Sequence, residues 1–109
     1  SQIAKAVAAI HADPAKSWGL VNLAKEAGMS RTQFAYAFKN TSGWTPVQYL
    51  GWWRMQLAWS YLHAGERVAS VADRVGYQSE AAFSRAFSKH FDQSAGAVRR
   101  AVQTRGQFT

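Results

Sequence analysis

The chain has 109 residues and sets 13 lysines and arginines against 6 acidic residues, which gives a formal net charge of +7. This length suits one compact domain and excludes folds such as the β/α barrel, which needs roughly 250 residues. The absence of cysteine excludes disulfides, thiolate nucleophiles and cysteine-based zinc sites. A hydrophobic content of 48% indicates that a folded domain carries the positive charge, and this charge favours a polyanionic partner.

The spacing of apolar residues predicts two helices at the start of the chain. The first begins near Ile3 and ends at Asp13-Pro14, because the residue before a proline disfavours the α region. The second is short and ends near Ala27. Gly28 follows it, at the position where a left-handed residue commonly closes a helix.

Two further helices are predicted before residue 63. Ser30 and Gln33 form the S-x-x-Q pattern of a capping box, which marks a helix start. Pro46 opens the next helix, which runs to about Leu62 and is apolar on two sides, so we expect it to be buried between two bodies. The inward stripe of the helix that begins at Ser30 is predicted to contain Phe34, Ala37, Phe38 and Thr41.

The second half of the chain repeats the first. Gly28 and Gly76 are 48 positions apart, whereas Phe34 and Phe83 are 49 apart, so the second copy has one extra residue in its turn. Each copy combines a short helix with alanine on its inner face, a glycine turn, and a serine-capped helix with the pattern Phe-x-x-Ala-Phe. This order is typical of a helix-turn-helix.

On these residues the chain resembles the DNA-binding domain of AraC/XylS-type bacterial transcription regulators. The resemblance covers residues 17–100 and is most specific in LVNLAKEAGMSRTQFAYAFKNTSGWTPVQYL and VASVADRVGYQSEAAFSRAFSKHF. It implies an all-α fold of about seven helices, in which residues 1–109 form a single DNA-binding domain. Two helix-turn-helix subdomains, 3–45 and 66–102, are expected on either side of a linker helix, 46–62.

The second copy departs from the pattern of this family at three positions after its serine-capped helix. Asp92 stands where the first copy has Gly43, Ala95 stands where it has Pro46, and Val98 replaces the usual aromatic residue. These departures concern the start of the last helix more than DNA binding.

Helical geometry, at about 100° per residue, identifies the outward residues of the two serine-capped helices. We predict that residues 30–40 and 79–90 are recognition helices, which present these residues to base edges in the major groove. Base readout is predicted for Arg31, Thr32, Ala35, Tyr36, Gln78, Glu80, Ala81, Ser84 and Arg85. Phosphate contacts are predicted for Ser30, Lys39, Ser79, Ser88, Lys89, Arg99 and Arg100. Arg85 is the strongest candidate, because a guanidinium matches the O6 and N7 acceptors of guanine.

The linker helix of 17 residues would span roughly 25 Å. With the width of the subdomains added, the recognition helices are expected about one DNA turn apart, in successive major grooves. Arg54 lies in the middle of this apolar helix. Since an unpaired buried charge is costly, we expect it to pair with Glu26 or Asp73, with a phosphate contact as the alternative.

An enzyme is not expected. His11, His63 and His90 are scattered, and the chain has no carboxylate pair, phosphate-binding glycine loop or H-E-x-x-H motif, so no metal or cofactor is predicted. The alternative to DNA binding is a cationic helical module that docks to a protein or a membrane. The basic residues are spread over several helices, which disfavours that alternative, and no segment is long and apolar enough to span a bilayer.

The resemblance also implies partners outside this chain. These are double-stranded DNA, RNA polymerase, and an effector-binding or dimerisation domain. A cytoplasmic, nucleoid-associated location follows from the same resemblance.

Overall fold

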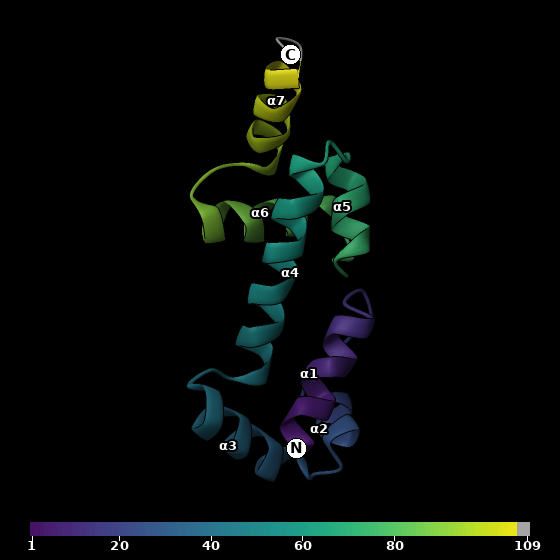
Figure 1. Ribbon diagram of the computed structural model, residues 1–109, viewed down its shortest axis with the longest axis vertical. Helices are drawn as coiled ribbons and strands as arrows, with labels where there is room; N and C mark the ends of the chain where they lie inside the picture. The colour runs from purple at the N-terminus through teal and green to yellow at the C-terminus, as the bar shows by residue number, and fades with distance from the viewer. Residues whose placement is uncertain (107–109) are drawn as a thin grey trace. The chain divides into compact units, whose positions relative to one another are not determined.

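The structure of the chain, a computed structural model, describes residues 1–106, which form seven α-helices and no strand (Figure 1). The all-α fold expected from the sequence is therefore confirmed. The chain divides into two compact units, one comprising Ser1–Trp53 and one beginning at Arg54. The division falls within the fourth helix.

The first unit contains α1 (Gln2–Ala12), α2 (Leu20–Ala27), α3 (Arg31–Ser42) and the first part of α4 (Pro46–His63). Helix α1 packs against α2 and α3, and α2 packs against α3. The apolar stripes of these helices, repeated every three or four residues, meet in one core. The buried residues of this core are Ala6, Ile10, Leu23, Ala24, Ala27, Phe34, Phe38 and Leu50.

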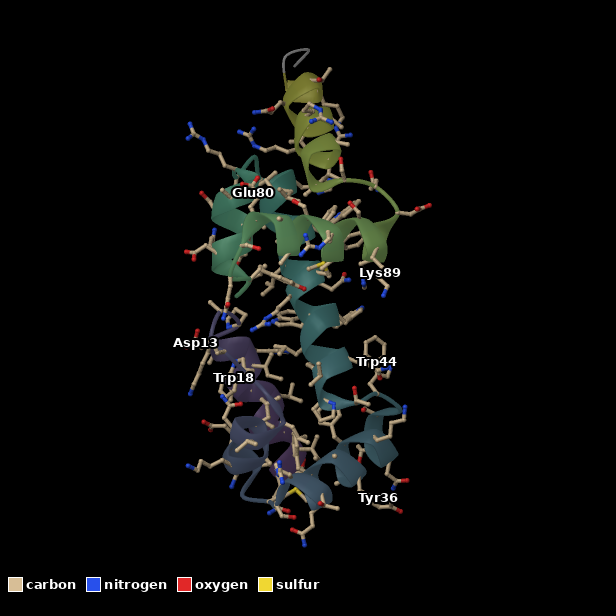
Figure 2. All side chains as sticks on the ribbon, turned by 180° about the vertical axis from the view of Figure 1, so that it is seen from behind. Asp13, Trp18, Tyr36, Trp44, Glu80 and Lys89 are labelled. Carbon is tan, nitrogen blue, oxygen red and sulfur yellow. The ribbon has the colours of Figure 1, made fainter. Side chains whose placement is uncertain are left out.

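The connection from α1 to α2 is held by an aromatic side chain. The indole N–H of Trp18 donates a hydrogen bond to the carbonyl oxygen of Asp13 at 2.7 Å, and both residues are labelled in Figure 2. The ammonium group of Lys16 lies 4.6 Å from the centre of the Trp18 ring, within range of a cation–π interaction. Trp18 also packs against the first core, which fixes the loop after α1 on this unit.

The turn between α2 and α3 has the predicted chemistry. Gly28 closes α2 in the left-handed region, with φ of 68°, which a residue without a β-carbon adopts at no steric cost. The hydroxyl of Ser30 accepts a hydrogen bond from the backbone N–H of Gln33 at 3.2 Å, and the Gln33 side chain accepts from the Ser30 N–H at 3.4 Å. The predicted capping box is confirmed, and it sets the first residue of α3.

The second unit contains the remainder of α4, α5 (Val68–Arg74), α6 (Glu80–Phe91) and α7 (Ala95–Gly106). Helices α5 and α6 pack against each other, and α7 packs against both. The hydroxyl of Ser79 caps α6 by accepting from the Ala82 N–H at 3.0 Å. The buried residues of this core are Met55, Ala58, Leu62, Val71, Ala72, Val75, Phe83, Phe87, Ala95 and Val98.

The three departures from the family pattern are accommodated at the start of α7. Asp92 closes α6 with φ of 57°, in the same left-handed region that Gly43 adopts after α3 with φ of 81°. Ser94 caps α7 by accepting from the Ala97 N–H at 3.0 Å. Ala95 and Val98 are both buried, at 1% and 4% exposure. The last helix therefore begins by an ordinary serine cap.

One detail of the predicted packing is wrong. Thr41 is exposed rather than inward, because the buried stripe of α3 ends one turn earlier, at Phe38. The two predicted apolar sides of α4 are buried or half-buried, whereas Val47 and Trp52, which lie outside those sides, are exposed. Helix α4 supplies one buried residue, Leu50, to the first core, and Met55, Ala58 and Leu62 to the second core.

Candidate nucleic-acid interface

Helix α3 has a buried face and a free outer face. Phe34 and Phe38 are 0% and 1% exposed, so the residues on the opposite side of the helix point away from the core. Tyr36 is 73% exposed, more than any other large hydrophobic side chain in residues 1–106. Figure 2 shows its side chain beside α3, directed away from the ribbon.

The remaining predicted base-readout residues of α3 surround Tyr36. Thr32 and Arg31 are exposed, and Ala35 is half-buried beside them. Thr32 lies one turn before Tyr36 on the same face, since residues four apart are neighbours on a helix. The structure thus brings these residues onto one surface of the first two turns of α3.

Helix α6 repeats this arrangement with different chemistry. Phe83 and Phe87 are fully buried, and Arg85, two residues after Phe83, is exposed on the outer face. Within the described part of the chain, Arg85 takes part in no ion pair. The guanidinium of Arg85 is therefore available to an external acceptor.

The other predicted base-readout residues of the second copy lie at the start of α6. Gln78, Glu80 and Ala81 are exposed, and Ser84 is half-buried. Figure 2 shows Glu80 at one end of α6 and Lys89 toward the other. The exposed carboxylate of Glu80 and the guanidinium of Arg85 offer an acceptor and a donor within two turns of one helix.

Most of the predicted phosphate-binding residues are exposed. They are Ser30, Lys39, Ser79, Ser88, Lys89 and Arg100. The capping hydroxyls of Ser30 and Ser79 already accept backbone N–H groups, and each hydroxyl retains its own hydrogen for donation.

The two arginines of α7 differ from each other. Arg99 is half-buried, and its Nε atom is buried without a hydrogen-bond partner in the structure. Arg100 is exposed. Its guanidinium lies against Gly96, with Nη1 3.1 Å from the position that a β-carbon would occupy there. Arg100 thus presents its charge at the first turn of α7.

Asn40 is a further candidate, outside the residues predicted from the sequence. Asn40 is exposed on α3, one turn after Tyr36 and on the same face of the helix. Its amide can donate and accept hydrogen bonds in the pattern that matches adenine. The spacing of four from Tyr36 would have identified it.

Arg54 is half-buried in the second unit. Burial lowers the pKa of Arg54, and the nearby Tyr77 raises it. Burial likewise raises the pKa of Tyr77, and the charge of Arg54 opposes that rise. The ring of Tyr77 packs edge-on against Phe83 with centroids 5.6 Å apart. The sequence suggested Glu26 or Asp73 as partners, and the structure identifies Tyr77, in the turn before α6, as a neighbour of Arg54.

No group of three or more metal-ligating side chains that could hold a metal ion occurs in residues 1–106. None of the helices described is long and apolar enough to cross a membrane.

Residues 23–101 match the family model described as a helix-turn-helix domain. The chain belongs to this family, and within it to the AraC type, which confirms the resemblance found from the sequence. It is 42% identical over 94 residues to the transcriptional regulator AlkR of Acinetobacter baylyi, a match that covers 85% of this chain and 31% of AlkR.

A putative AraC-like transcription regulator of Streptomyces lividans is 41% identical over 99 residues, which cover 90% of this chain and 33% of the regulator. The chain thus spans about a third of the length of these curated relatives. Among solved structures, the DNA-binding domain of AdpA, in complex with a target DNA, matches with a TM-score of 0.89 and 29% identity over 96% of both chains.

Proposed function

We propose that the chain is the DNA-binding domain of a bacterial transcription regulator and binds specific sequences in double-stranded DNA. One observation carries this proposal. Two serine-capped helices, α3 and α6, are each anchored by two buried phenylalanines, and each presents an exposed outer face. A helix-turn-helix uses such a face to contact base edges in the major groove. The likeness to the DNA-bound AdpA domain supports the same function.

The proposed contacts divide into base readout and phosphate binding. Arg85 donates two hydrogen bonds to a guanine, and Glu80 accepts one from a cytosine amino group. Lys39 and Lys89 bind phosphates, which fix the position of the protein on the duplex without reading its sequence. Residues 27–65, which include all of α3, contain no acidic residue, so nothing in this segment repels the DNA backbone.

Each recognition helix enters one of two successive major grooves in this proposal. Residues 3–45 and 66–102 then act as the two DNA-binding subdomains, and residues 46–62 link them. An asymmetric binding site follows, because the outer faces of α3 and α6 carry different side chains. The recognition of two grooves by one chain requires no second copy.

The partners beyond DNA follow from the class of protein. We propose that the chain works with RNA polymerase and with an effector-binding or dimerisation domain, in the cytoplasm and at the nucleoid. The relatives that match are named as transcription regulators, and the chain corresponds to about a third of each. The remaining length of such relatives leaves room for another domain.

Selection of bound sequences from a random duplex pool tests the proposed function. We expect one enriched sequence, bound at least about 10³-fold more tightly than unrelated DNA at physiological salt. Flotation with anionic vesicles in parallel tests the alternative of a cationic membrane-docking module. Strong vesicle binding with no enriched DNA sequence would overturn the proposal.

A further inference from the structure

The centre of the outer face of α3 carries no charged or amide side chain, whereas the centre of the outer face of α6 carries Arg85. Thr32, Ala35 and Tyr36 contribute two methyl groups and an aromatic ring. None of these three side chains carries a charge or an amide at neutral pH. Charged or amide-bearing residues flank this centre: Arg31 lies one turn before Ala35, and Lys39 and Asn40 lie one turn further along the helix.

These three residues form one contiguous patch. Thr32 and Tyr36 are four residues apart, and Ala35 lies three residues after Thr32, so Thr32 is a neighbour of both on the helix surface. The patch lies in the first two turns of α3 (Arg31–Ser42), the part of a recognition helix that contacts base edges. Phe34 and Phe38 are buried in the core on the inner side of α3, and they fix the orientation of the patch.

Tyr36 is free to contact another molecule. Its side chain is 73% exposed, and it makes no hydrogen bond, ring contact or ion pair with any residue between 1 and 106. The two other prominent aromatic side chains of this unit, Trp44 and Trp52, are less exposed and pack edge-on with centroids 6.0 Å apart. Tyr36 therefore exposes an aromatic ring that no intramolecular contact accounts for.

The major groove offers one apolar feature, the C5 methyl group of thymine. A patch of two methyl groups and a ring can pack against this methyl group. The same apolar groups cannot distinguish bases by their hydrogen-bond donors and acceptors. Cytosine lacks the methyl group at the same place, so an apolar patch favours thymine over cytosine. The hydroxyl of Tyr36 can in addition donate to the O4 atom of thymine.

We infer that α3 recognises thymines through their C5 methyl groups, with Tyr36 as the residue that determines this specificity. The inference rests on the proposed DNA binding and adds the class of base edge that α3 selects. The two halves of the DNA site are then recognised by different chemistry. Helix α3 contacts thymine methyl groups, and Arg85 of α6 contacts guanine. C5-methylated cytosine carries the same methyl group. It can replace thymine at positions where α3 contacts only the methyl group and not the O4 atom.

The test replaces thymines of the selected sequence, one at a time, with deoxyuridine, which removes only the methyl group. For the wild-type chain, we expect deoxyuridine at one or more positions to weaken binding by about fourfold per methyl group, the factor for burying one such group. In the Tyr36→Ala variant, the same replacements should change affinity by less than about twofold. Tyr36→Phe keeps the ring and should retain the wild-type sensitivity.

The Arg85→Ala variant is the matched control, because it alters the other helix. It should keep the sensitivity to deoxyuridine while losing discrimination for guanine. Specific binding that is indifferent to deoxyuridine at every position would overturn the inference and leave the proposed function intact. Sensitivity that persists unchanged in Tyr36→Ala would overturn the role of Tyr36. Absence of any sequence-specific binding would instead contradict the proposed function itself.

Discussion

Arg85 lies on α6 at the position that Tyr36 holds on α3. The two residues are 49 positions apart in the sequence, each follows a buried phenylalanine by two residues, and both are exposed. The buried scaffold is thus the same in both copies, whereas the exposed side chain at its centre is a cation in one and a neutral aromatic in the other. In our proposal, this difference makes the DNA site asymmetric.

Lys39 is expected to contribute affinity without sequence preference. Its exposed ammonium group binds a phosphate in our proposal, so Lys39→Ala should weaken binding to all sequences alike. The slope of log affinity against log salt concentration should fall by about 1. Fluorescence anisotropy at several salt concentrations measures both effects. Lys5→Ala, an exposed lysine on α1, is the control and should leave the slope unchanged. A loss confined to one base position would contradict the phosphate contact.

The left-handed conformation of Gly43 predicts a specific cost for a side chain there. A β-carbon at Gly43 would meet no atom within 4 Å, so only the backbone, with φ of 81°, resists it. Gly43→Ala should lower the free energy of unfolding by about 1 kcal/mol. Gly51→Ala is the matched control, because Gly51 lies inside α4 in equally open space. That change should raise stability by up to about 1 kcal/mol. Urea unfolding distinguishes them, and effects of the same sign would contradict the conformational reason.

Asp92 adopts the same left-handed region as Gly43 but has a side chain. With φ of 57° it is the one non-glycine residue with positive φ among those described. Asp92→Gly should therefore stabilise the second unit, by up to about 1 kcal/mol. Thermal unfolding measures the change. A decrease in stability would show that the Asp92 side chain makes a favourable contribution larger than the backbone strain.

Tyr77 should make stability fall at alkaline pH. Burial raises the pKa of Tyr77 above its ordinary value of 10.0, and the charge of Arg54 only partly opposes this rise. The folded state then holds the phenol proton more tightly than the unfolded state. Its contribution to stability is therefore complete below the unfolded pKa and is lost as the pH rises through the folded pKa.

Urea unfolding between about pH 8 and pH 11 tests this dependence. Tyr77→Phe has no ionisable group at this position and should lose less stability over that interval than the wild type. Burial also raises the pKa of Tyr49, so a smaller alkaline loss should remain in the variant. If the free energy of unfolding fell equally steeply with pH in the wild type and in Tyr77→Phe, a buried, neutral Tyr77 would be contradicted.

The helices and their inner faces could be predicted because the signals are local. The capping box at Ser30 fixes the start of α3 through bonds over three residues, and the phenylalanine spacing identifies the buried side of each recognition helix. The repeat then transfers the same interpretation to α6. These features depend on neighbours along the chain, which the sequence shows directly.

The features that were missed depend on contacts between elements. The proximity of Arg54 to Tyr77 joins a helix to a distant turn, and helical spacing carries no information about it. The exposure of Thr41 depends on where the first core ends, which an apolar pattern on α3 does not reveal. The conformation of Asp92 could be predicted only in part. Its alignment with Gly43 identified the residue that closes the helix, but the sequence did not give its φ.

Two parallel selections from a random duplex pool, with the wild type and with Arg85→Ala, test base readout most directly. We expect the wild type to select an asymmetric site with two clusters of specified bases. The Arg85→Ala variant, folded as the wild type by circular dichroism, should lose a guanine in one cluster at a cost of about 1–3 kcal/mol and keep the other cluster. An unchanged site with evenly reduced affinity for all sequences would contradict base readout by Arg85.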